Sequence, residues 1–303
     1  MVAKRLVLLF LAAFILSGCG GSGPKSLQTP DAARSVSSAE VEAIVAEFLS
    51  IFRPFDPVVL MVWPPIEGLP HCEFTHGPIT IRQVTDELVE AEFDYSGKVR
   101  FEKVPDWEEI ADGRLVLQIC WEPVNRQWTT GGSVSLRARE VFGRPSDMPI
   151  PSLEIANLVV NGEGAPDKLV GEAPLAVDFS VSGMTPAWEE NFEGGARLYA
   201  ADRGVGYDGS GEPQRSGNSF TVAFSAPPGT LGRYWLEVRA GSWKKPEDCM
   251  LPVGTRVAKS VLLTVAQPPV YVPIPDPPDP VPPLPPGDPG TPDDPDVPPL
   301  PPL

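Results

Sequence analysis

The chain has few of the residues that most often carry catalysis or bind nucleic acid. Its 303 residues include two His, and 24 Lys and Arg stand against 40 Asp and Glu, a formal net charge of −16. Affinity for a duplex depends on Lys and Arg that neutralise phosphates, so this charge argues against nucleic acid as a partner. General bases are scarce, and the sequence has no nucleophile elbow or phosphate-binding loop. We therefore expect no catalytic residue, no metal, no cofactor and no nucleic-acid partner.

The chain also lacks an apolar run long enough for a transmembrane helix. The run at residues 6–16 is much shorter than the roughly 20 residues that span a bilayer core. Lys4 and Arg5 precede it and small residues follow it, which is the layout of a secretory signal. The alternative interpretation is an uncleaved membrane anchor.

The small residues that end this signal form a specific motif. Leu16-Ser17-Gly18-Cys19 resembles the lipobox of bacterial lipoproteins. The resemblance implies that residues 1–18 are a signal peptide, and that Cys19 carries two or three acyl chains, such as palmitate, which hold it stably on a bilayer. Gly20 stands where Asp retains lipoproteins at the inner membrane of enteric-type bacteria. The resemblance therefore implies the cell envelope, and the outer membrane in a Gram-negative source. Residues 19–36 are predicted to be the lipidated Cys and a flexible tether.

Proline is the most over-represented residue, with 39 in the chain. It is concentrated in residues 267–303, where Asp is the only charged residue. Proline fixes φ and has no backbone N–H, so neither a helix nor a sheet forms easily there. We expect this acidic, Pro-rich tail to be disordered.

One helix is predicted near the start of the body. Ser37 or Ser38 is a suitable N-cap for the segment AEVEAIVAEFLSIF, whose apolar residues recur at helical spacing. Pro54 is predicted to end it. Because its polar face carries Glu and no Lys or Arg, we expect it to pack on the protein and not to lie on a membrane.

Short runs of alternating polarity, separated by Gly, Pro and Asp, predict β-strands in the rest of the body. A Pro-rich segment near residue 150 divides them into residues 37–150, the helix plus a β-rich domain, and residues 151–266. The segments 96–121 and 216–243 share a Ser-Gly, a strand, a Gly-Arg and a Trp, which suggests two copies of one β-unit.

The second domain resembles bacterial immunoglobulin-like (Ig-like) domains of the PKD type. The segment Gly171-Glu172-Ala173-Pro174-Leu175-Ala176-Val177-Asp178-Phe179 matches the approach to the second strand of that family. The Trp-x-Phe-Gly-Asp-Gly sequence typical of PKD domains is absent, so "Ig-like" describes the resemblance better. The fold class expected is all-β, with tandem Ig-like β-sandwiches of which the first is the weaker match.

The expected compartment and the position of each Cys in the chain predict how the cysteines are used. With Cys19 lipidated, three remain, and we predict a Cys72–Cys120 disulfide because both lie in one domain of an exported protein. Cys249 is then a free thiol or forms an intermolecular bridge. An alternative joins Cys72 and Cys120 with His71 and His76 in a zinc site, although the spacing is not that of a zinc finger.

Other candidate sites are weaker. The segment DRGVGYDGSGE offers Asp202, Asp208, Ser210 and Glu212 to calcium, but Gly, Asp and Ser in that pattern equally favour a solvated loop. Of seven Trp, Trp128 and Trp243 each follow a predicted strand and are the candidates for a binding surface.

Together these features predict a non-catalytic lipoprotein of the cell envelope that acts as a surface or periplasmic interaction or scaffold module. Its partners are expected to be the bilayer, through Cys19, and an envelope protein or glycan. A carbohydrate-binding lipoprotein that uses Trp side chains is the first alternative, and a glycan-active enzyme with two facing carboxyls is the second.

Overall fold

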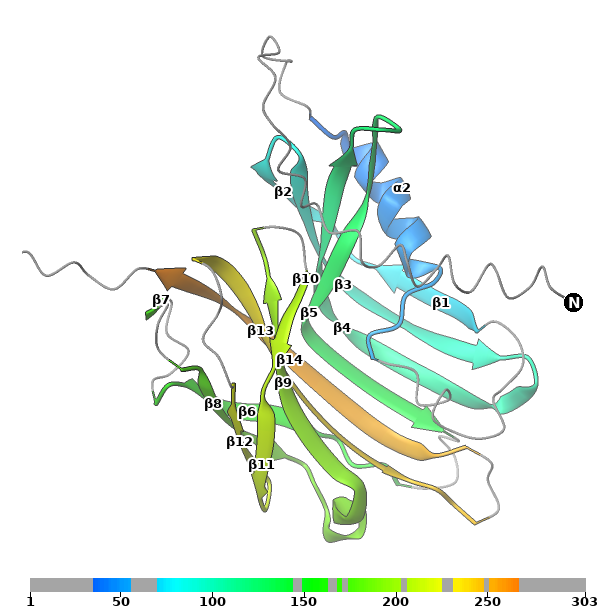
Figure 1. Ribbon diagram of the computed structural model, residues 1–303. Helices are drawn as coiled ribbons and strands as arrows, with labels where there is room; N and C mark the ends of the chain where they lie inside the picture. The colour runs from blue at the N-terminus through cyan, green and yellow to red at the C-terminus, as the bar shows by residue number, and fades with distance from the viewer. Residues whose placement is uncertain are drawn as a thin grey trace, which may run out of the picture. The chain divides into compact units, whose positions relative to one another are not determined.

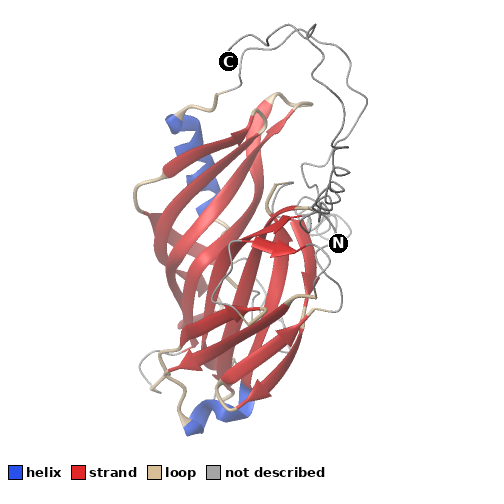
Figure 2. Ribbon diagram, turned by 90° about the vertical axis from the view of Figure 1, so that its left-hand side faces the viewer, coloured by secondary structure: helices blue, strands red, loops and turns tan. Residues whose placement is uncertain are grey.

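The computed structural model describes residues 35–55, 70–143, 149–162, 168–170, 174–202, 206–224, 231–247 and 251–266. Its helical elements are α2 (Ser38–Leu49) and the 3₁₀ turn η2 (Pro186–Asn191). Its strands are β1 (His71–His76), β2 (Thr80–Thr85), β3 (Leu88–Phe101), β4 (Val104–Glu122), β5 (Gln127–Gly143), β6 (Glu154–Val160), β7 (Lys168–Val170), β8 (Ala176–Ser182), β9 (Phe192–Ala200), β10 (Gly206–Ser210), β11 (Glu212–Ser216), β12 (Ser219–Ala223), β13 (Gly232–Lys244) and β14 (Val253–Ala266). Strands predominate, as Figure 2 shows, which confirms the all-β prediction.

Helix α2 begins as predicted. Ser37 is its N-cap: the Ser37 hydroxyl accepts a hydrogen bond from the Glu40 backbone N–H, and the Glu40 carboxylate accepts one from the Ser37 N–H. Val41, Val45 and Leu49 are buried at helical spacing. None of the helices that the structure describes is both long and apolar enough to cross a membrane.

One large, mainly antiparallel sheet runs through both predicted domains. Its strands lie in the order β1-β3-β4-β5-β14-β13-β9-β10, with β2 beside β3 and β7 beside β14 (Figure 1). The join is the pairing of residues 137–142 of β5 with residues 254–259 of β14. The boundary predicted near residue 151 therefore does not interrupt the sheet, and residues 35–266 belong to one compact unit.

A second sheet covers one face of the C-terminal half. Its order is β11-β12-β8-β6. Alternate residues of β8 and β12 meet alternate residues of β9, β13 and β14 in one core, which contains Phe179, Phe220, Tyr234 and Leu236. Two sheets packed through period-two side chains form a sandwich-like layer. Tyr234 lies in this core and Trp235 on the opposite face, as their alternation predicts.

The N-terminal half is built differently. Val41, Val45 and Phe52 pack on the sheet face formed by β3 and β4, around Phe93 and Leu117. Among the described residues of this half, α2 covers the sheet face opposite the one that the second sheet covers in the other half, because register places Tyr95 beneath α2 on the same face as Ala138 and Ala258. The predicted boundary thus separates two hydrophobic cores that share one sheet.

The proposed internal repeat is wrong. Residues 96–121 form the end of β3 and most of β4, which pair with each other. Residues 216–243 contain β12 and β13, which lie in different sheets. Similar strand patterns arise wherever one strand face is buried, so sequence similarity of this kind does not fix pairing.

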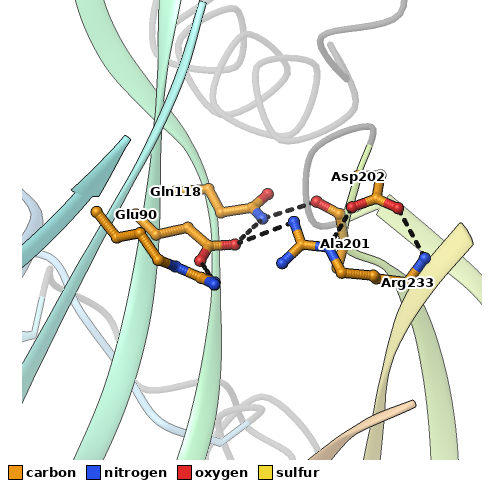
Figure 3. A network of polar contacts seen from close by, with 6 residues as sticks. Glu90, Gln118, Ala201, Asp202 and Arg233 are labelled. Atoms are coloured by element: carbon orange, nitrogen blue, oxygen red, sulfur yellow. Dashed lines mark hydrogen bonds and ion pairs between the residues drawn. The ribbon is translucent and has the colours of Figure 1, made fainter. Parts of the chain in front are cut away.

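A buried polar network links the two halves (Figure 3). Gln118 on β4 is fully buried, and its side-chain amide donates to the Ala201 carbonyl at 2.9 Å and to the Glu90 carboxylate at 3.2 Å. Glu90 also pairs with Arg82, and the Arg233 guanidinium lies 4.0 Å from it. Beside the network, Val116 and Val134 pack on Trp235.

Replacing Gln118 with Leu is expected to lower the free energy of unfolding by about 1–3 kcal/mol, because the Ala201 carbonyl and the buried Glu90 lose a donor. Urea unfolding measures the change. Gln127→Leu, at an exposed position of β5, is the control and should change stability little. Equal effects of the two substitutions would show that the network does not stabilise the junction.

Candidate functional site

The candidate site lies on the large sheet, on the face opposite the sandwich core. Residues directly opposite each other in paired strands point to the same face. Register therefore places one row of side chains across four strands, Glu193 on β9, Gly241 on β13, Arg256 on β14 and Glu140 on β5.

The neighbouring row of this face is almost free of large side chains. It consists of Gly195, Arg239, Ala258 and Ala138, again one from each strand. Arg239 thus stands among small neighbours, and Phe55, from the segment after α2, packs on Ala138 and Ala258.

A cavity of about 480 Å³ opens over these rows. We call it the arginine cavity. It is lined by Phe55, Phe142, Glu193, Gly194, Gly195, Ala196, Arg197, Ser210, Gly211, Arg239, Ala240, Gly241, Ser242, Trp243, Pro252 and Arg256. Small-molecule sites in proteins range over roughly 300–1,000 Å³, so its size suits a ligand of that class.

Charged side chains are buried next to the cavity and support it. Arg53 forms an ion pair with Glu109, and Arg239 forms one with Glu237. The Arg256 Nε lies 3.7 Å from a carboxylate oxygen of Glu140. We call these six residues the buried charge cluster; the three Glu side chains are at most 4% exposed. Buried charges persist when they are paired, so the cluster fixes the arginines in place.

Burial changes the acidity of two of these carboxyls. The pKa of Glu140 is raised to about 8, chiefly by burial and also by the nearby Glu109 carboxylate, while the Arg256 charge opposes both effects. Burial also raises the pKa of Glu109, against the opposing effect of its partner Arg53. At neutral pH Glu140 is therefore largely protonated.

Aromatic rings hold the arginine side chains. The Arg256 guanidinium lies 5.0 Å from the centre of the Phe142 ring and 5.8 Å from that of Phe55. The Arg239 guanidinium is also 5.8 Å from Phe55. Such cation–π contacts orient the guanidinium planes at the edge of the cavity.

The structure separates the two predicted Trp candidates. Trp243 is 38% exposed and lines the arginine cavity. Trp128 lies at the start of β5, where its ring meets that of Trp121 edge to face at 5.6 Å. Trp128 also packs against the core beneath α2. Trp243 therefore remains a candidate for binding, whereas Trp128 has a packing role.

The predicted Cys72–Cys120 disulfide is wrong. Cys72 is a free thiol, whereas Cys120 is disulfide-bonded. On β3, Cys72 is opposite Val99 and Cys120 is opposite Leu88. Eleven residues of strand separate these positions, roughly 36 Å. Disulfide-bonded Cα atoms lie within about 7 Å, so the two cannot join. Cys19 and Cys249 lie outside the described residues.

The alternative metal sites do not assemble in the part of the chain that the structure describes. No group of three or more His, Cys, Asp and Glu side chains there could hold a metal ion. Asp202 instead accepts hydrogen bonds from Arg233, and Glu212 lies on the exposed strand β11. The side chain of Asp208 and the acylation site Cys19 lie outside the described residues.

A larger cavity, of about 710 Å³, is a weaker candidate. Its charged lining balances Asp94, Asp112 and Glu154 against Arg137, Arg139 and Lys259. Asp112 and Arg139 pair with each other, and both side chains are about half exposed. Solvent screens such pairs, and the lining offers no surplus charge to a ligand.

Sequence reasoning missed Arg197, Arg239, Arg256 and Gly195. The alternation Arg239-x-Gly241-x-Trp243 does indicate that these three share a strand face. The register with β9 and β14 that brings the other residues beside them is not visible in the sequence. No protein-family model matches the chain, and no curated protein or solved structure is significantly similar to it.

Proposed function

We propose that the chain is a non-catalytic, membrane-anchored lipoprotein of the bacterial cell envelope whose folded body binds a partner. The arginine cavity is the observation that carries this proposal. Its floor is rigid paired sheet, and its arginines are held by buried ion pairs and aromatic rings. The carboxyls of raised pKa, Glu109 and Glu140, are buried and are not among the residues that line the cavity, which favours binding over acid–base catalysis.

Within this proposal, residues 151–266 form an Ig-like sandwich. The order β6-β8-β12-β11 facing β14-β13-β9-β10 supports it, because Ig-like sandwiches place strands A-B-E-D against G-F-C-C′. The N-terminal half then extends the sheet from β14, so that β14 is not an exposed edge.

The anchor is tested by Cys19→Ser. The variant is expected to carry no acyl chain, because bacterial lipoproteins, which the motif resembles, are lipidated at the sulfur of this Cys. Growth with a labelled fatty acid, followed by purification of the protein, measures incorporation. Acyl label on the Ser variant equal to that of the wild type would overturn the assignment of Cys19.

Carbohydrate binding is the second candidate function. Trp243 favours it, because an exposed indole beside a cavity lined by arginines can stack on a sugar ring while the arginines bind its polar groups.

Crosslinking in live cells tests the interaction role. The full-length protein and a chain ending at Gln267 are compared, and the bound partners are identified. We expect the shorter chain to retain its partners. Loss of every partner in the shorter chain would place the function in residues 268–303 and contradict the proposal.

A further inference from the structure

We propose that the arginine cavity binds an acidic sugar unit, with the ligand carboxylate on the arginines and the sugar ring against Trp243. This inference rests on the binding role proposed above and names the chemical class of the ligand. Three observations support it: the charge of the lining, the shape of the floor and the position of the aromatic side chain.

The charge of the lining selects an anion. Arg197, Arg239 and Arg256 line the cavity, and Glu193 is the acidic residue among the described lining side chains. The cavity thus gathers three guanidinium groups in a chain of net charge −16, and Arg239 and Arg256 also face the buried carboxyls of Glu237 and Glu140. The planar guanidinium presents five N–H donors, so one Arg can serve an internal carboxylate and a ligand at the same time. Carboxylates suit this fork geometry.

The floor leaves room for a ring. Gly195 and Gly241 both line the cavity; a Cβ built at Gly195 meets no atom within 4 Å, whereas one built at Gly241 would meet the Arg256 side chain at 2.9 Å. Any larger residue at 195 would project into the cavity. The floor is therefore open to a flat ligand at Gly195, beside the Arg256 side chain that covers Gly241.

The aromatic side chain stands at the far end of this floor. Arg239, Gly241 and Trp243 are alternate residues of β13, so Trp243 lies about 13 Å along the strand from Arg239. Arg256 on β14 is opposite Gly241 and therefore flanks the space between Arg239 and Trp243. A ligand that spans the floor thus meets positive charge and an indole face together. A simple inorganic anion uses only the charge, and a neutral sugar only the indole.

Isothermal titration calorimetry on the full chain tests the ligand class. The probes are a galacturonate trisaccharide, the matched neutral galactose trisaccharide, and inorganic phosphate. We expect the galacturonate trisaccharide to bind. The other two probes should bind at least about tenfold more weakly, because each of them lacks one of the favourable contacts. Equal binding of the neutral sugar would overturn the role of the arginines, and tightest binding of phosphate would overturn the role of Trp243. No binding of galacturonate by folded protein would overturn the inference.

Matched variants locate the site. Gly195→Leu is expected to abolish binding, since the side chain enters open cavity space. Gly209→Leu is the control: its Cβ also meets no atom within 4 Å, but it does not line the cavity, so it should bind as the wild type does. Trp243→Ala is expected to weaken binding about tenfold, and Trp243→Phe less. Urea unfolding confirms that each variant is folded.

The outcomes separate this inference from the proposed function. Failure of galacturonate to bind, with partners still crosslinked by the chain ending at Gln267, contradicts only the ligand class. Galacturonate binding that survives Gly195→Leu in folded protein places the ligand elsewhere and overturns the site.

Discussion

Replacing Arg256 with Met is expected to lower the free energy of unfolding by about 3–5 kcal/mol at pH 9, because removal of one partner leaves a buried charge uncompensated. The Arg256 Nε lies 3.7 Å from a carboxylate oxygen of Glu140, and its guanidinium also lies over the rings of Phe142 and Phe55. Urea unfolding measures the effect. At pH 6 the loss should be smaller, because Glu140 is then protonated and needs no counter-charge.

Arg139→Met is the matched control for this prediction. Arg139 pairs with Asp112 on the same sheet, but both side chains are about half exposed, so its removal should cost less than about 1 kcal/mol. Losses that are equal for the two variants, or that do not depend on pH for Arg256→Met, would contradict a buried charge cluster.

Glu140→Gln is expected to remove a decrease in stability between pH 5 and pH 8. In the folded protein the pKa of Glu140 is raised from 4.5 to about 8, chiefly by burial. The folded state therefore binds more protons than the unfolded state in this window, and stability falls as pH rises. One such group changes stability by at most roughly 1.4 kcal/mol per pH unit. A neutral amide at position 140 removes this dependence and makes the variant the more stable protein above pH 8.

Unfolding curves at pH 5, 6.5, 8 and 9 measure this dependence. Glu212→Gln on the exposed strand β11 is the control, and its free energy of unfolding should change with pH as that of the wild type does. If Glu140→Gln keeps the wild-type slope as well, Glu140 does not titrate as its burial requires.

The sequence contained enough information for the local structure. The N-cap at Ser37, the buried face of α2 and the opposite orientations of Tyr234 and Trp235 follow from short-range patterns, and all are confirmed. These features depend on neighbouring residues alone.

The pairing between strands that are distant in the sequence could not be predicted. The join of β5 to β14 brings together residues more than one hundred positions apart, and no local pattern encodes it. Strand β3 runs without a break from Leu88 to Phe101, because Ser96 and Gly97 remain in register with β1 and β4. The cysteine prediction failed for the same reason, since domain membership says nothing about strand register.

The candidate site depends both on local sequence patterns and on pairing between distant strands. Trp243 was found from its position after a strand, whereas the arginines around it depend on register across β9, β13 and β14. The segment DRGVGYDGSGE, for which a solvated loop was one interpretation, contains β10 and the first residue of β11, whose pairing with β9 and β12 is again non-local. Ser210 and Gly211 at this point complete the lining of the cavity.

The central claim is that the folded body meets its partner at the arginine cavity, and site-specific photocrosslinking in live cells tests it most directly. A photoreactive Phe analogue is placed at position 243, at the cavity, or at position 124, which is 85% exposed on the β4–β5 turn. We predict capture from position 243 and not from position 124, and loss of capture from position 243 when Gly195→Leu is added. Equal capture from both positions, or capture from position 243 that survives Gly195→Leu, would contradict the account.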